Sequence, residues 1–182
     1  DGESIDDDNL VGLVNHFLSG GIETTSRQTS MLVYDLLSNP DQLELLRNNR
    51  ELIPAAVEEN LRHNGIGGST CRNVLDDVEI CGTTIPKDSV VFTFHLAASR
   101  DPSRWENPHK FDITRPVQKH LTFAMGPHMC IGQHFARFLL SEFLTHFLDD
   151  LPNVRWDPDQ PVPKPRGWNQ RGCTTQPVVW DV

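Results

Sequence analysis

The stretch Phe123-Ala-Met-Gly-Pro-His-Met-Cys130-Ile-Gly132 places one cysteine between two glycines, directly before a long helical pattern. A thiolate that binds a metal from one side needs a backbone that turns tightly around the sulfur, and Gly126 and Gly132 allow the dihedral angles of such a turn. The helix expected from Gln133 would point its positive end toward the sulfur and lower the cost of keeping it ionised. The pattern predicts a metal-ligating Cys130, although a lone cysteine is more often a buried side chain in a turn.

The same residues, in the pattern Phe-x-x-Gly-x-His-x-Cys-x-Gly, resemble the heme-ligand signature of the cytochrome P450 family of heme-thiolate monooxygenases. The resemblance implies that Cys130 binds the iron of heme b and that Phe123 shields the sulfur from water. It also implies that His128 binds an acidic group at the edge of the cofactor. The cofactor-binding residues implied by the resemblance also include Gly20, Gly126 and Gly132.

Apolar residues recur with helical spacing over residues 8–37 and predict one long buried helix. Its middle, Ser19-Gly-Gly-Ile-Glu-Thr-Thr-Ser26, has two glycines where a helix should be strongest, so we expect the helix to open locally. The alternative is a helix crossing at which glycines allow close approach. Gly-Gly-x-Glu-Thr-Thr also resembles the oxygen-activating segment of the family, which implies that Glu23 and Thr24 deliver protons during catalysis.

Glu59 and Arg62 stand at i,i+3 in a predicted helix over residues 51–63, where their side chains can pair. An exposed pair of this kind is common and contributes only about 0–1 kcal/mol. Glu-x-x-Arg is also the family's helix motif, and Arg115 stands where its third member is expected. The resemblance implies a buried ion network with a structural role.

Residues 64–70 are rich in glycine and predict a flexible connector. In the family this loop lines the substrate pocket, and its small side chains would leave room there. The candidate contacts are Ile66, Gly67, Gly68 and Ser69. Arg72 stands where a cation for a heme propionate is expected, but Thr70 replaces the acidic residue of the camphor-hydroxylating type.

Four short β-rich runs predict a small antiparallel sheet, at residues 72–74, 78–81, 83–86 and 89–93. Residues 133–148 are apolar almost all round and predict a buried helix. The tail predicts a hairpin over residues 167–175. The resemblance implies that its tip at 172–174 enters the substrate pocket, where Cys173 would be a lining thiol.

A length of 182 residues, 37% of them hydrophobic, fits one globular domain, and a net charge of −9 argues against binding to nucleic acid or anionic membranes. Four cysteines without a Cys-x-x-Cys pair favour free thiols and a cytoplasmic protein. The acidic start, Asp1-Gly-Glu-Ser-Ile-Asp-Asp-Asp8, and the lack of a long apolar run predict neither a signal peptide nor a membrane anchor.

The resemblance implies a mainly α fold with small β-sheets, in which residues 1–182 are the C-terminal, heme-binding portion of a single cytochrome P450 domain. The soluble bacterial camphor-hydroxylating type is the most similar. We expect that the N-terminal helices of the family are absent from this chain, and that it represents part of a longer enzyme.

The implied activity is insertion of one oxygen atom from dioxygen into a small hydrophobic substrate of terpenoid size. Electrons would come from a ferredoxin-type partner, with Lys119, His120 and Arg137 as candidate contacts.

Two other hypotheses stay open: a non-catalytic heme-binding or ligand-sensing protein, and a zinc-binding domain, although His128 and Cys130 lack a nearby pair of ligands. Of the eight histidines only His128 is given a role, and the others are taken mostly as polar surface.

Overall fold

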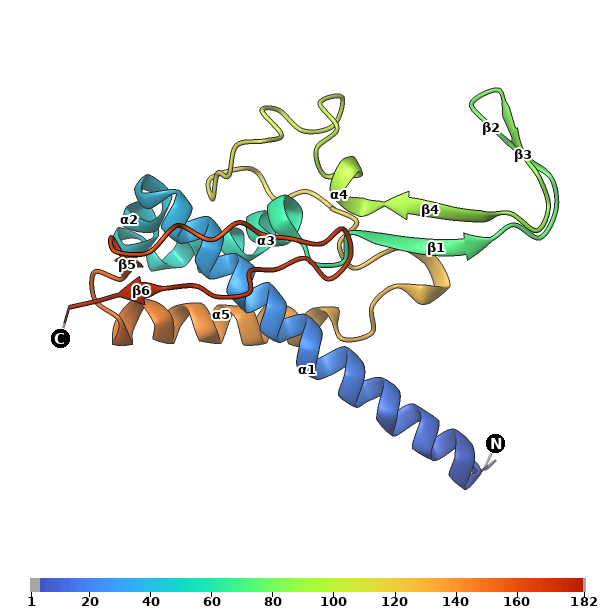
Figure 1. Cartoon of the computed structure of the whole chain (residues 1–182), viewed down its shortest axis with the longest axis horizontal. Coiled ribbons are helices and arrows are strands. Elements are labelled where there is room, and N and C mark those ends of the chain that lie inside the picture. Colours follow the sequence, from blue (N-terminus) through green and yellow to red (C-terminus); the bar gives the residue numbers. More distant parts are fainter. Residues whose placement is uncertain (1–3, 182) are drawn as a thin grey trace.

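The computed structural model describes residues 4–181, so the first three residues of the acidic start and Val182 lie outside the described part. The chain is mainly helical with small sheets, which confirms the predicted fold class (Figure 1). The α-helices are α1 (Asp7–Ser38), α2 (Pro40–Asn48), α3 (Ile53–Asn64), α4 (His95–Ala98) and α5 (Gln133–Asp150). Short 3₁₀ helices occupy Arg50–Leu52 and Gly126–His128. The strands are β1 (Ser69–Asn73), β2 (Val78–Ile80), β3 (Thr83–Ile85), β4 (Val90–Phe94), β5 (Arg155–Trp156) and β6 (Val178–Val179).

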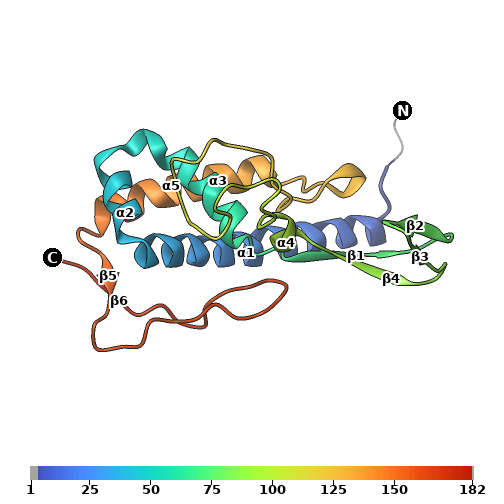
Figure 2. The same cartoon turned by 90° about the horizontal axis from the view of Figure 1, so that it is seen from above.

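The hydrophobic core lies where α1, α2, α3 and α5 pack together (Figures 1 and 2). Helix α1 contributes to it from Leu32 onward and α5 from Leu140 onward, through side chains such as Leu36 and Leu144. Apolar side chains in the first halves of these helices are exposed, including Phe17, Phe135 and Phe138. The prediction that both helices are buried along their whole length is therefore wrong for this structure.

Helix α1 is continuous through its glycine-rich middle, so the expected local opening is wrong. The Thr24 hydroxyl donates to the carbonyl of Gly20, one turn earlier, and Thr29 does the same to Thr25. These bonds let hydroxyl side chains stay in the helix without competing for its N–H groups. The alternative of a close helix crossing is not formed either, since a Cβ at Gly20 or Gly21 would meet no atom within 4 Å.

The β-rich segment forms two separate ribbons instead of one sheet. β1 pairs antiparallel with β4, from Ser69 opposite Phe94 to Asn73 opposite Val90. β2 pairs only with β3, at the far end of the same projection (Figure 1). The backbone of Val74 pairs with Ser89 and Asp88 between the two ribbons, so the chain continues as one long hairpin. β5 and β6 form a third pair in the tail.

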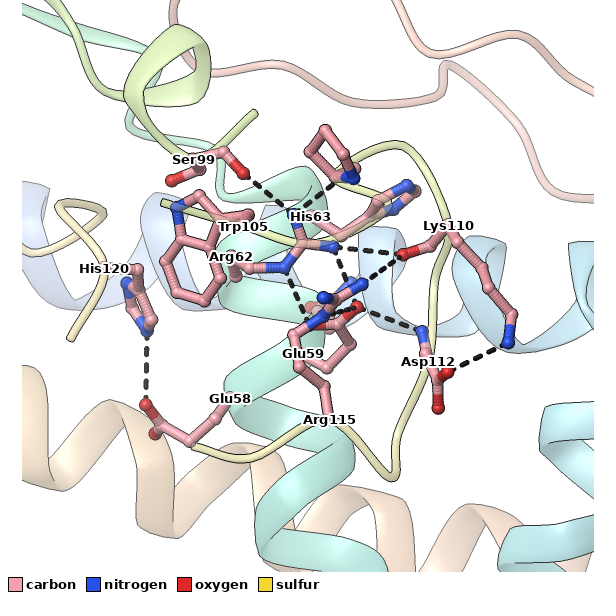
Figure 3. A network of polar contacts seen from close by, with 12 residues as sticks. Glu58, Glu59, Arg62, His63, Ser99, Trp105, Lys110, Asp112, Arg115 and His120 are labelled. Carbon is pink, nitrogen blue, oxygen red and sulfur yellow. Dashed lines mark hydrogen bonds and ion pairs between the residues drawn. The ribbon is translucent and has the colours of Figure 1, made fainter. Parts of the chain in front are cut away.

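Glu59, Arg62 and Arg115 come together between α3 and the segment 99–115, which has no regular structure over most of its length (Figure 3). Arg62 is 1% exposed and binds the Glu59 carboxylate through Nε at 2.7 Å and Nη2 at 2.8 Å. Its remaining donors reach three backbone carbonyls, of Ser99 at 2.8 Å, Pro108 at 2.9 Å and Lys110 at 3.2 Å. The five N–H groups of this guanidinium therefore all have acceptors.

Arg115 extends the ion network of Glu59 and Arg62 to the segment that leads toward Cys130. Its Nε lies 3.3 Å from Glu59, and its other nitrogens bind carbonyls of the same segment, including Glu106 at 2.6 Å. The Glu59 carboxylate also accepts the Asp112 N–H at 3.0 Å. A buried charge is stable only when it is paired and fully hydrogen-bonded, and both conditions are met by these contacts.

Replacing Arg62 by Met should lower the free energy of unfolding by about 3–5 kcal/mol, because the change leaves Glu59 underpaired and the carbonyls of Ser99 and Pro108 without a donor. The matched control is Arg50→Met, since Arg50 pairs with Asp149 at 3.0 Å but its side chain is 40% exposed. That control should change the stability by less than about 1 kcal/mol. Urea unfolding measures both, and equal effects would contradict the structural role of Arg62.

Candidate heme-binding site

The cysteine loop turns back on itself between Phe123 and the start of α5. The Cys130 N–H donates to the Phe123 carbonyl at 2.9 Å, and the Met129 N–H donates to that of Gly126 at 3.0 Å. Gly126 has a φ of +80°, in the left-handed region that favours glycine. Gly132 has a φ of −84°, which any residue can adopt, so the expected unusual angle there is wrong. A Cβ at this position would lie 3.9 Å from the Cys130 sulfur, at an ordinary contact distance.

The Cys130 side chain is exposed at the end of this loop, directly before α5. His128 is also exposed, in the 3₁₀ turn of the loop. Arg72 is exposed on β1, with one guanidinium N–H on the carbonyl of its neighbour Cys71 at 2.7 Å. Within the described part of the chain, the predicted cofactor-binding residues Cys130, His128 and Arg72 are therefore accessible to a ligand.

Glu58, one residue before the buried Glu59, ties α3 to the cysteine loop and to α5. Its carboxylate pairs with Arg137 of α5 and lies 3.2 Å from Nε2 of His120. The Arg137 guanidinium lies over the Phe123 ring, 4.6 Å from its centroid, at a distance that suits a cation–π contact. The Thr122 N–H donates to Nδ1 of His120 at 3.3 Å, so Nε2 carries the proton that faces Glu58.

These contacts correct the expectation that His120 and Arg137 form a docking surface. The His120 side chain is only 2% exposed, and the polar end of Arg137 is engaged with Glu58. Lys119 is exposed and remains available to a partner. Burial alone would raise the pKa of Glu58, but hydrogen bonds from His120 and Arg137 outweigh it and lower the pKa to about 2.

A cavity of about 250 Å³ lies between the cysteine loop and the β1–β4 ribbon. Its lining residues are Thr70, Arg72, Thr93, His95, Leu121, Ala124 and Met125. The ring of His95 is buried, and its Nδ1 has no hydrogen-bond partner among the described residues. Its Nε2 lies 3.3 Å from the Thr70 hydroxyl. Burial lowers the pKa of His95, an interaction with the Gly67 backbone opposes the shift, and the nearby Arg72 cation adds to the lowering, so that a neutral ring is favoured.

This cavity fits the edge of a heme. Leu121, Ala124 and Met125 are apolar, as a flat hydrophobic ring system requires, while Arg72 offers a cation for a carboxylate. The unpartnered Nδ1 of His95 is a further group that a polar ligand atom could satisfy. His95 is not among the residues that the sequence predicts for the site, and its one signal in the sequence is its place directly after the run 90–94.

The predicted proton-delivery residues lie on α1, in its exposed half. Glu23 pairs with Arg27 at 2.8 Å, and the Thr24 hydroxyl binds the Gly20 carbonyl. Arg27 also donates to the carbonyl of Gln170 in the tail, at 3.3 Å. The Glu23 carboxylate and the Thr24 hydroxyl therefore bind different partners, although the two residues are adjacent in the sequence.

The glycines of the predicted substrate loop make room for the chain itself, which corrects the expectation that they leave space for a ligand. A Cβ at Gly68 would lie 2.1 Å from the carbonyl oxygen of Trp168, and one at Gly65 would lie 2.5 Å from that of Leu61. Ile66 and Ser69 are buried, and Gly67 is partly exposed.

The tail also differs from the prediction. Arg166 pairs with Gly172, so the turn lies between them and contains Trp168, and residues 172–174 are not its tip. Cys173 follows this turn and is partly exposed, and burial raises the pKa of its thiol.

Three histidines besides the predicted one make specific contacts, so the interpretation of most histidines as polar surface is incomplete. They are His63, which lies 3.2 Å from Asp35, and the buried His95 and His120. Within residues 4–181, no cluster of three or more His, Cys, Asp or Glu side chains could hold a metal ion, which leaves the zinc hypothesis without a ligand set there. None of the helices in that range is long and apolar enough to cross a membrane.

Glu58 should make the protein sensitive to acid. Its folded-state pKa of about 2 lies below the ordinary value of 4.5, so its stabilisation is present above pH 4.5 and is lost as the pH falls toward 2. After allowance for solvent screening, Glu58→Gln should remove about 1–2 kcal/mol of this pH-dependent stability. Urea unfolding between pH 2.5 and pH 6 measures the change, and the exposed Glu142 of α5, changed to Gln, is the control. If the free energy of unfolding fell with pH in the same way in the wild type and in Glu58→Gln, the low pKa of Glu58 would be contradicted.

Comparisons with known proteins show the family of the chain. The sequence profile described as Cytochrome P450 matches residues 1–180. The chain is 36% identical over 183 residues to cytochrome P450 monooxygenase PikC of Streptomyces venezuelae, covering 99% of this chain and 44% of that protein. It is 38% identical over 185 residues to cytochrome P450 105A3 of Streptomyces carbophilus, with the same coverage.

A solved structure shows the same fold. The crystal structure of CYP109E1 from Bacillus megaterium in complex with testosterone superimposes with a TM-score of 0.95 and 27% identity, covering 100% of this chain and 51% of that one. The chain thus spans about half the length of the relatives it matches. Members of this family bind heme b, the cofactor that the cavity fits. From the matching profile, the identity to these relatives and the shared fold, the chain belongs to the cytochrome P450 family.

Proposed function

We propose that the chain is the C-terminal, heme-binding portion of a single-domain heme-thiolate monooxygenase. The observation that carries the proposal is the exposed Cys130 at the end of a hydrogen-bonded loop, of which Ala124 and Met125 line a cavity with an apolar wall and a cationic edge. We assign to this enzyme the insertion of one oxygen atom from dioxygen into a small hydrophobic substrate of terpenoid size, in the cytoplasm.

Several residues of this chain would hold the cofactor, each through a different contact. Cys130 would ligate the iron, Arg72 and His128 would bind the propionates, and His95 would add a neutral hydrogen-bonding group. Phe123 would cover the sulfur, held in place by the Arg137 cation above its ring. Heme with a thiolate ligand supplies the iron that activates dioxygen and the electron density that favours O–O cleavage.

Glu23 and Thr24 would handle protons. A threonine hydroxyl that donates to its own helix can rotate and donate to a ligand instead, because its bond to the Gly20 carbonyl is local. Glu23 is half exposed and can exchange protons with solvent, while Arg27 holds its position. Directed delivery matters because a proton on the wrong oxygen atom releases peroxide instead of product. Electrons would come from a ferredoxin-type partner, with Lys119 as the contact that remains available.

Thr24→Ala should separate an oxygenase from a ligand sensor. In the full-length protein with an electron donor, we expect oxygenated product per reductant to fall by about tenfold and peroxide to rise by a matching amount. Thr25→Ala is the control, since Thr25 is the next residue and differs from Thr24 only in its direction on the helix. Product and peroxide are measured together with oxygen consumption. Unchanged product in Thr24→Ala would contradict the proton role, and a wild type that binds ligands without reductant-dependent product would favour the sensor.

A further inference from the structure

Gln28 is a buried amide on α1, one helical turn after Thr24. Its side chain is 3% exposed although it lies close to the exposed half of the helix. Its Oε1 accepts the Ile66 N–H at 2.9 Å, and its Nε2 donates to Oδ1 of Asn60 on α3 at 2.6 Å. One side chain therefore connects α1, α3 and the loop that precedes β1.

The direction of these hydrogen bonds is fixed by the buried carboxylate of Asp35, which is 1% exposed. Its oxygens accept the side-chain N–H groups of Asn60 at 2.7 Å and Asn64 at 2.5 Å. The Asn60 amide must then present its oxygen to Gln28. Gln28 in turn must donate with its nitrogen, so its oxygen is left to accept from Ile66. Asp35 thus orients Gln28 through one intervening amide, that of Asn60.

The loop held by Gln28 continues directly into the wall of the cavity. The Gly68 N–H donates to the Ile66 carbonyl at 2.9 Å, and the His95 N–H donates to the Gly68 carbonyl, also at 2.9 Å. β1 begins at Ser69 and brings Thr70 and Arg72 to the cavity. A shift of Ile66 would therefore be passed on to both strands of the β1–β4 ribbon.

We propose that Gln28 is a positioning residue that fixes the cavity wall formed by Thr70, Arg72 and His95 relative to Glu23 and Thr24 on the same helix. It would thereby set the size of ligand accepted between the wall and α1. The proposal rests on the proposed function, because it takes the cavity as the edge of the heme site and the space between the heme and α1 as the ligand pocket. None of the hydrogen-bond partners of Gln28 is a residue that lines the cavity, so Gln28 acts on the wall through the Ile66 backbone.

The test compares Gln28→Met with Gln176→Met in the full-length, heme-loaded protein. Methionine keeps the length of the side chain but cannot make the three hydrogen bonds of the Gln28 amide, with Asn60, Asn64 and Ile66. Gln176 is the matched control. Its Nε2 donates to the Ser30 carbonyl of the same helix at 2.7 Å, but Gln176 belongs to the tail and does not hold the Ile66 loop. Amide hydrogen exchange at Ile66 and the dissociation constants of imidazole and 4-phenylimidazole are the readouts.

Gln28→Met should exchange the Ile66 amide at least about tenfold faster, as loss of one buried hydrogen bond implies, with the core of α5 unchanged. The ratio of the two dissociation constants should change by about fivefold or more, because the larger azole meets the displaced wall and the small one does not. Gln176→Met should change neither.

Unchanged exchange at Ile66, or faster exchange with an unchanged ratio, would overturn the proposal. If Gln28→Met does not fold, the wild type still tests the anchor, since an Ile66 amide that exchanges as in an unfolded peptide also overturns it. A protein that binds neither azole would contradict the proposed function, and the exchange at Ile66 would then still decide whether Gln28 holds the loop.

Discussion

The buried guanidinium of Arg62 is the constraint on which the rest of this structure depends. It cannot lose its charge, and it is out of contact with water, so all five of its N–H groups must find acceptors within the protein. Two bind Glu59 and three bind carbonyls of Ser99, Pro108 and Lys110. A segment with little regular structure is fixed in this way against α3. The chain then enters the cysteine loop from a defined position.

Helix α3 organises the site through two adjacent carboxylates that face different directions. Glu59 points to Arg62 and Arg115, whereas Glu58 points to His120 (Figure 3). Glu58 also pairs with Arg137. Neighbouring residues on a helix are about 100° apart, so one helix can hold two different segments at once. The first carboxylate orders the approach to the cysteine loop, and the second orders the loop and the helix that follows it.

The sequence was sufficient for the elements and motifs that depend on local pattern. The approximate ranges of α1, α3 and α5 follow from helical periodicity. The pairing of Glu59 with Arg62 follows from their spacing. Arg115 could be placed only through the family resemblance, because no local pattern connects residues so far apart.

What could not be predicted depends on partners distant in sequence. Gly68 is small because the Trp168 backbone lies against it, and nothing near residue 68 indicates that contact. His95 and Gln28 look like ordinary polar residues in sequence, and only the fold buries them beside the cavity and the loop. The continuity of α1 was missed because propensity counts the glycines but omits the local hydroxyl bonds and the cooperativity of a long helix.

The central claim is that Cys130 of this chain holds heme iron as a thiolate. The most direct test is the absorption spectrum of the full-length protein, reduced and exposed to carbon monoxide, with its intact mass measured on the same sample. The account predicts a Soret band shifted far to the red, as a thiolate ligand opposite carbon monoxide produces. A heme band without that shift would contradict thiolate ligation by Cys130, and with it the proposed oxygenase.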